Sequence, residues 1–423
     1  MAMLMRWFSR LALVLFLFVL ALAAIWGYAR LTSPTEAQRE AIALMQRPPP
    51  ADGENGWAIL MDLPPAPAAS LPASVDCRDG DDCIAHIETA LDANAQTLEA
   101  WRPRLEAAAT ALRAPVFRGP EAPRADASAV PEAIPSFQPV TQLDALRALD
   151  FVRGNPAGAL DATCQDALGA VRWATTPDML IDAMIGIAVF RQSAALIADM
   201  RRRAPDLPLP ASCAALAIAP DPAVEGMMCN GMRGEWHFLQ RMVASTPIEG
   251  EVPSHWAPAW LAPLLHDEDW LLARSAERYA SLCGSEAAEA ARADRAIAMG
   301  SPPRRWVDRV AFPISIVLDD IAEPAHFDFL ERQLDFVAQR RLLAAVLQMD
   351  AMDEAMSNAE RFAAVPEALR EGARPLLIDA DGSALSVPLR ARRSEQEGGA
   401  LRLPLPARNA SITSEAGGVV NID

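Results

Sequence analysis

One uncharged run near the amino terminus constrains this chain more than any other feature. Leu11 to Ala29 reads LALVLFLFVLALAAIWGYA, with Arg10 before it and Arg30 after it. Its nineteen residues approach the roughly 20 that cross a bilayer core as a helix. Trp26 and Tyr28 lie at the outer end, where amphipathic rings prefer the membrane interface. The run therefore predicts a transmembrane anchor over residues 11–29.

A cleaved secretory signal is the alternative interpretation of the same segment. Ala21-Leu22-Ala23 has the small-x-small form that a signal peptidase accepts. The apolar run continues past that site to an aromatic and arginine border. We therefore favour an uncleaved signal anchor.

The orientation of the anchor depends on charge and cysteines. Arg6, Arg10 and the amino terminus face Arg30 and Arg39, so the positive-inside rule only slightly favours a cytoplasmic segment 1–10. All six cysteines follow the anchor and none forms a CxxC pair, which is typical of disulfides in an exported chain. Alanine-rich, lysine-free usage is typical of high-GC bacterial coding. We predict a single-pass protein of the bacterial inner membrane with its bulk in the periplasm.

Charge and composition exclude several functions. All 38 basic residues are arginine, which excludes Schiff-base catalysis, lysine-bound pyridoxal phosphate and a Walker A loop. The net charge is −17, and residues 1–29 carry only Arg6 and Arg10, so the remainder carries −19. This acidity argues against nucleic-acid binding, and because it repels anionic headgroups it also disfavours peripheral lipid binding as the task of the exported part. We predict no cofactor.

Residues 30–76 are rich in proline and predict a semi-extended stalk. A short helix is expected from Pro34 to about Gln46, with Ser33 as its N-cap. A cluster at Trp57 is expected to touch the main domain.

The main domain is expected over 77–375, and it begins at a turn that holds Cys77 and Cys83. A local disulfide is the simplest interpretation, with Asp81 or Asp82 capping a helix over 84–113. The four carboxylates of this turn raise a calcium alternative, but the alternating ligand spacing is missing.

The segment 115–140 has no helical period and contains many prolines. We favour an extended segment along the surface; the alternative is an arm that docks a partner through Phe117 and Phe137.

Helical periodicity dominates residues 141–374. The apolar helix from Pro177 to about Met200 resembles a second membrane span, but its uncharged stretch is short and predicts a buried core helix. Other helices are expected at 222–245, 256–283, 285–299, 324–349 and 351–371.

The last segment, 376–423, predicts a small β appendage and a loose tail. Strands are expected on each side of the Asp381-Gly382 turn as a hairpin, and the pattern at 401–405 indicates a third strand. Cys164 with Cys213 and Cys229 with Cys283 are the favoured remaining disulfides, because each would tie neighbouring helices.

No GxSxG, HExxH or GxGxxG string is present, so no signature selects a reaction. The richest region is 236–270, where the indoles of Trp256 and Trp260 share a helical face. Aromatic core packing is the favoured interpretation; a carbohydrate or peptide groove is the alternative. A metal site is disfavoured because no two histidines of the set have helical spacing; the ligands weighed are His237, His255, His266, Asp267 and Asp269.

The sequence thus predicts a mainly α protein: a transmembrane helix, an exported helical array and a small C-terminal β hairpin element. The favoured function is a non-catalytic envelope component that binds an unidentified envelope protein. The alternative is a membrane-tethered hydrolase using carboxylates or a metal near 236–270. The binding candidates are Trp236, Trp256, Trp260, Trp270, Phe117 and Phe137.

Overall fold

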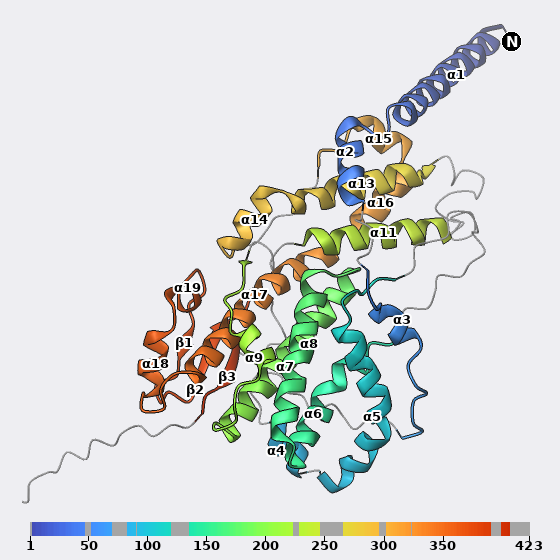
Figure 1. Cartoon of the computed structure of the whole chain (residues 1–423). Helices are drawn as coiled ribbons and strands as arrows, with labels where there is room; N and C mark the ends of the chain where they lie inside the picture. The colour runs from blue at the N-terminus through green and yellow to red at the C-terminus, as the bar shows by residue number, and fades with distance from the viewer. Residues whose placement is uncertain are drawn as a thin grey trace, which may run out of the picture.

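The structure is a computed structural model of the whole chain, and it is mainly helical with a small antiparallel sheet (Figure 1). It describes residues 2–46, 52–69, 83–89, 91–119, 135–222, 228–245, 265–295, 302–322, 324–390 and 399–406. The predicted fold class is confirmed: an apolar N-terminal helix, a helical body and a C-terminal β element.

The first helix, α1 (Ala2–Leu31), projects from one end of the body (Figure 1). Its segment Arg6–Leu31 is apolar and long enough to cross a membrane, and the most apolar stretch of this segment is not buried against the body. Leu180–Arg203 is also apolar and long enough to cross a membrane, but 72% of its most apolar stretch is buried inside the body. It is therefore a core helix, as the sequence predicts. The exposed α1 is consistent with a signal anchor.

Helices at the α1 end of the body form the membrane-proximal unit, so named here for its place beside the apolar helix (Figure 1). The unit comprises α2 (Glu36–Met45), α11 (Cys229–Ser245), α13 (Glu268–Ala280), η5 (Ser281–Cys283), α14 (Ser285–Arg292), α15 (Trp306–Ala311) and α16 (Pro313–Ala322).

The distal part of the body contains the largest apolar core. Its helices are α3 (Gly56–Met61), α4 (Cys83–Thr89), α5 (Leu91–Arg113), η2 (Val140–Gln142), α6 (Leu143–Val152), α7 (Pro156–Thr175), α8 (Leu180–Arg203), α9 (Ala211–Leu216), α17 (Pro324–Asp350), α18 (Asn358–Ala364) and α19 (Glu367–Arg370). Helices α7 and α8 pack closely because Gly186 has no side chain: a Cβ there would lie 2.8 Å from the carbonyl oxygen of Ala170.

The sheet has the order β1-β2-β3, formed by β1 (Leu377–Ile378), β2 (Ala384–Pro388) and β3 (Ala400–Pro404). Leu385 pairs with Leu403 in register, and both side chains are buried in the distal core. Gly382 has φ +67°, the left-handed conformation that the Asp-Gly turn requires. The predicted hairpin and third strand are confirmed, while residues 407–423 lie outside the described part.

Residues 30–76 differ from the predicted stalk. Residues 36–45 and 56–61 form α2 and α3, which pack on α13 and α5 respectively. The N-cap of α2 is Thr35, not Ser33, because Thr35 and Gln38 form a reciprocal capping box. Trp57 is buried as expected. The predicted helix that ends near Gln46 is thus confirmed as α2. The prediction of a stalk is wrong for both helices, because their short apolar faces find partners on the body only in the tertiary structure.

Two further helix predictions need correction. Residue 285 begins α14 as predicted, but that helix ends at Arg292, before Asp294 adopts a positive φ of 47°. The expected helix over 351–371 is instead the two short helices α18 and α19. Ser357 caps the first, and Pro366 separates them.

Both favoured disulfides are present. Cys164 joins Cys213, linking α7 to α9, and Cys229 joins Cys283, linking α11 to the end of α13 through η5. Cys77 and the side chain of Cys83 lie outside the described residues. The exposed apolar helix and these bridges together indicate a secreted or membrane-anchored, extracytoplasmic protein.

Candidate functional site

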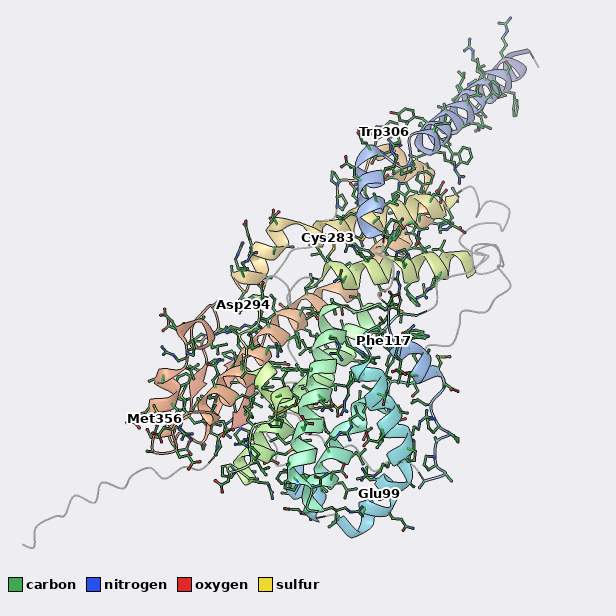
Figure 2. The ribbon with its side chains drawn as sticks, viewed as in Figure 1. Glu99, Phe117, Cys283, Asp294, Trp306 and Met356 are labelled. Carbon is green, nitrogen blue, oxygen red and sulfur yellow. A yellow bond between two sulfur atoms is a disulfide. The ribbon has the colours of Figure 1, made fainter. Side chains whose placement is uncertain are left out.

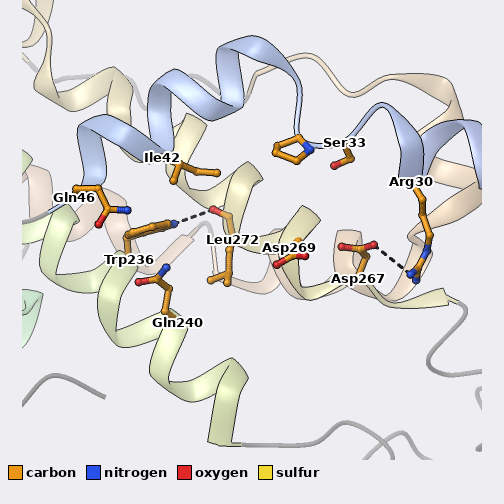
Figure 3. Close-up of a pocket in the computed structure, with 10 residues that line it drawn as sticks. Arg30, Ser33, Ile42, Gln46, Trp236, Gln240, Asp267, Asp269 and Leu272 are labelled. Atoms are coloured by element: carbon orange, nitrogen blue, oxygen red, sulfur yellow. Dashed lines mark hydrogen bonds and ion pairs between the residues drawn. The ribbon is translucent and has the colours of Figure 1, made fainter. Parts of the chain in front are cut away.

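A hollow of about 430 Å³ opens in the membrane-proximal unit. It lies between the end of α1, helix α2, helix α11 and the start of α13 (Figure 3). Its walls mix charged, amide and apolar side chains, as ligand sites commonly do. The lining residues are Arg30, Ser33, Pro34, Ile42, Gln46, Trp236, Gln240, Asp267, Asp269 and Leu272. We call this cavity the membrane-proximal hollow.

Local structure fixes the walls of the hollow. Asp267 is the N-cap of α13 and accepts a hydrogen bond from the backbone N–H of Trp270 at 2.8 Å. Trp236 on α11 donates its indole N–H to the carbonyl of Leu272 on α13 at 2.9 Å. On α2, the carbonyl of Leu44 accepts a hydrogen bond from Arg233 of α11. These contacts join the three helices that enclose the space.

Arg30 connects the anchor helix to the rim. Its guanidinium lies 3.6 Å from the Asp267 carboxylate and donates to the carbonyl of His266 at 3.1 Å. The same group lies over the ring of Trp26, 4.5 Å from the centroid. The Arg30 guanidinium therefore interacts both with one wall of the hollow and with the aromatic end of α1.

The rim beside Arg30 is acidic. Burial, with the nearby charges of Asp269 and Asp267, raises the pKa of Glu268. Asp269 is exposed, and within the described part of the chain no cation lies at ion-pair distance from it. Asp269 thus leaves negative charge at the opening, where it can meet a cation from a ligand.

Polar groups that can donate or accept hydrogen bonds lie on the opposite side, toward α1 and α2. Gln46 is exposed and Gln240 is partly exposed. The hydroxyl oxygen of Ser33 is buried and has no hydrogen-bond partner among the described residues. Such a hydroxyl costs free energy unless a ligand or water satisfies it.

A serine–histidine contact lies directly behind the acidic rim. Ser315 Oγ is 2.9 Å from His266 Nδ1 and accepts a hydrogen bond from the backbone N–H of Asp267 at 3.0 Å. Burial lowers the pKa of His266, which favours the neutral imidazole. Because Ser315 is fully buried, this contact positions the turn before α13 and does not present a nucleophile to the hollow.

The predicted tryptophans separate into different environments. Trp236 and Trp270 are each 1% exposed and belong to different apolar clusters. Trp236 contributes to the hollow, whereas Trp270 packs on Phe312 with ring centroids 5.5 Å apart. Trp256 and Trp260 lie outside the described residues, so the groove that they would form stays a prediction.

The other two binding candidates face inward. The ring of Phe117 lies 4.1 Å from that of Trp173, and Phe137 meets the same indole edge-on at 6.1 Å. Both phenylalanines pack against the distal core. This placement disagrees with a docking arm that presents the two rings to a partner, because their apolar surface already packs against the distal core. Residues 120–134 of the arm lie outside the described part.

The metal alternative receives no support from the described residues. Among them, no three His, Cys, Asp or Glu side chains are grouped as metal ligands would be. His266 lies behind the hollow, and His237 stacks edge-on against Trp236. His255 lies outside the described residues.

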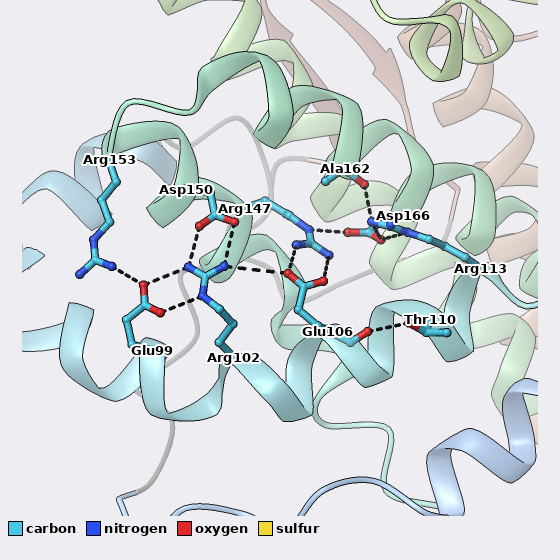
Figure 4. A network of polar contacts seen from close by, with 10 residues as sticks. All are labelled: Glu99, Arg102, Glu106, Thr110, Arg113, Arg147, Asp150, Arg153, Ala162 and Asp166. Atoms are coloured by element: carbon cyan, nitrogen blue, oxygen red, sulfur yellow. Dashed lines mark hydrogen bonds and ion pairs between the residues drawn. The ribbon is translucent and has the colours of Figure 1, made fainter.

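A second charged cluster joins α5, α6 and α7 (Figure 4). Arg147 donates to Asp166 at 2.9 Å and to Glu106 at 2.7 Å, and Arg113 donates to the other oxygen of Asp166 at 2.8 Å. Every carboxylate in the cluster is paired with a guanidinium, so none is available as a general base. The cluster is a brace between helices, completed by Glu99, Arg102, Asp150 and Arg153.

Sequence reasoning missed the apolar walls of the hollow and four of its polar residues, which are Arg30, Ser33, Gln46 and Gln240. None of them forms a motif. The one usable signal was Thr35-x-x-Gln38, a capping box that ends the anchor region and starts a helix immediately after it.

The chain has no recognisable relative in the comparisons with known proteins. No family model matches it, and no curated protein or solved structure gives a match. Its function therefore has to be argued from the site itself.

Proposed function

We propose that this chain is a single-pass protein of the bacterial inner membrane, with residues 30–423 in the periplasm. We propose further that it is a non-catalytic assembly component that binds a segment of another envelope protein in the membrane-proximal hollow. The observation that carries the proposal is the composition of the hollow and its place at the foot of the anchor helix.

The lining chemistry fits a polypeptide segment that carries a basic side chain. Asp269 offers a carboxylate at the rim, and the amides of Gln46 and Gln240 can pair with a peptide backbone. Ile42 and Leu272 supply apolar wall for a neighbouring side chain. The volume of about 430 Å³ falls in the usual range of binding pockets, roughly 300–1,000 Å³.

Charge supports the same partner. The chain beyond the anchor carries −19, the difference between −17 for the whole chain and +2 for residues 1–29. An acidic surface accelerates association with basic partners and repels acidic ones.

Site-specific photocrosslinking tests the proposal. A photoreactive amino acid replaces Gln240 in the full chain at native expression, and the matched control places it at Glu354, on the distal part of the body. We expect one protein adduct at the hollow that is absent from the control and that disappears in Asp269→Arg. Equal labelling at both positions, or an adduct indifferent to Asp269→Arg, would contradict the proposal.

A membrane-tethered hydrolase is the second candidate, because the carboxylates of Asp267 and Asp269 both line the hollow. Asp267 is held by Arg30 and by its capping contact, so Asp269 is the carboxylate with freedom to act as a base. Asp269→Asn should then abolish hydrolysis of an envelope polymer. If no turnover is detected with the unchanged chain, this candidate fails.

A further inference from the structure

The last turns of α1 are built into the body, with no stalk between them. Ala29 is fully buried in a cluster with Trp270, Val307 and Phe312. Ile25, four residues earlier, packs against the same cluster. Contacts between α1 and the body begin there, since residues 11–24 are exposed.

Helix length sets the depth of this junction. The exposed stretch Leu11–Ala24 has fourteen residues and is about 21 Å long at ~1.5 Å per residue. A bilayer core is about 30 Å thick. The full apolar run to Ala29 is about 28 Å long. The run therefore spans the core only if its last turns, which the body packs against, also lie in the membrane.

Helix α15 is the element that covers those turns (Figure 1). It buries Val307 and Ala311 against the anchor cluster and exposes the other face. On that face Trp306 is 65% exposed, and Val310 follows it by one helical turn. Figure 2 shows Trp306 at the outside of the body, beside the end of α1.

The exposed groups have the chemistry of a membrane interface. Trp306 and Tyr28 are exposed aromatic side chains with a polar tip, and Leu31 and Val310 are exposed aliphatic ones. Arg309, between Trp306 and Val310, is exposed and can meet lipid phosphate. Tryptophan and tyrosine concentrate at this depth in membrane proteins, with arginine at the headgroups. We call Tyr28, Leu31, Trp306, Arg309 and Val310 the juxtamembrane face.

We infer that the juxtamembrane face is a lipid-binding surface that seats the body in the outer interface of the membrane that α1 spans. The inference rests on the anchoring part of the proposed function. The continuity of the face with α1 and the missing length of the span identify lipid as the occupant.

The overall acidity of the body does not oppose this seating. Net charge acts on an approach from solution and is screened beyond about 8 Å at physiological salt. The anchor already holds the face at the interface, so only local groups matter. There Arg309 is cationic and exposed, while Asp308 is buried and paired with Arg305 at 2.6 Å.

Tryptophan quenching in vesicles tests the inference with the full chain. The protein is reconstituted in phosphatidylcholine vesicles that carry bromine either near the headgroup end of the acyl chain or deep in it. Subtracting the spectrum of Trp306→Phe isolates the Trp306 signal, and Trp26→Phe and Trp101→Phe isolate an anchor signal and a distal one. Trp306 is exposed, so its replacement by phenylalanine leaves the core untouched.

We expect shallow bromine to remove most of the Trp306 signal and aqueous acrylamide to leave it largely intact. Trp101 is buried on α5, so neither brominated lipid should quench its fluorescence. A Trp306 signal that acrylamide quenches and bromine does not would overturn the inference. If the Trp26 signal is quenched in that case, the anchor itself stands; if Trp26 also escapes bromine, the proposed anchoring fails.

Discussion

Asp144 gives the sharpest test of the energetics of the body. It lies in the first turn of α6, is 4% exposed, and accepts a hydrogen bond from Ser193 at 3.2 Å. Burial, helped by the neighbouring charge of Asp166, raises its pKa from 3.8 to about 7, although the Ser193 hydrogen bond and Arg147 oppose the rise. The side chain is therefore largely protonated in the folded protein below neutral pH.

The sign of the pH dependence follows from this difference. An unfolded chain releases the Asp144 proton near its ordinary pKa of 3.8, while the folded protein holds it until about pH 7. Stability is thus lost as the pH rises between these values. The pKa difference is worth about 4 kcal/mol above pH 7, because each pH unit corresponds to about 1.4 kcal/mol. About 2 kcal/mol of this develops between pH 5 and pH 7, and roughly 3 kcal/mol between pH 5 and pH 8.

Asp144→Asn removes the charge and keeps an oxygen that can accept from Ser193. We expect the variant to gain about 3 kcal/mol over the unchanged protein as the pH is raised from 5 to 8. Denaturant unfolding of the full chain in detergent at each pH measures the difference. Asp206→Asn, at an exposed turn, is the matched control and should show no such trend. A constant difference between Asp144→Asn and the unchanged protein would refute the reasoning.

Three further predictions address the packing and the bridges. Gly234→Ala would place a Cβ 1.6 Å from the carbonyl oxygen of Asp178, so we expect the unfolding free energy to fall by about 2 kcal/mol or more. An unchanged unfolding free energy would contradict the close contact between Gly234 and Asp178. Replacing Cys229 and Cys283 together by alanine should cost about 2–5 kcal/mol, measured as a lower melting temperature than that of the unchanged, oxidised protein; equal melting temperatures would contradict a stabilising bridge. The lowered pKa of His266 makes protonation unfavourable in the folded state, so stability should fall below about pH 6.5, and His266→Gln should flatten that part of the profile.

The sequence predicted the features that depend on long or local patterns. A nineteen-residue uncharged run identifies α1, and charges inside the second apolar helix identify it as a core helix. The hairpin at Gly382 follows from turn chemistry. Cys229 and Cys283 pair because the helices that carry them are neighbours, which a helical array makes plausible from order alone.

The hollow could not be predicted in the same way. Its walls come from the end of α1, from α2, from α11 and from α13, segments that are far apart in the chain. Gln46 and Gln240 are single amides with no pattern around them, and only tertiary packing brings them to one cavity. The prediction of a stalk failed for a related reason. Proline content indicates an extended chain, whereas the apolar face of α2 packs on α13.

Under the proposed function, the junction of α1 with the body decides which partners the hollow can bind. A flexible tether would let the body sample a range of heights above the membrane. Here Ala29 is fully buried and Arg30 links the anchor to Asp267, so the anchor and the hollow move as one piece. With α1 in the membrane as proposed, the opening lies near the lipid headgroups. A partner that binds in the hollow would then have to offer a segment at that height, which favours another membrane-anchored chain over a freely diffusing one.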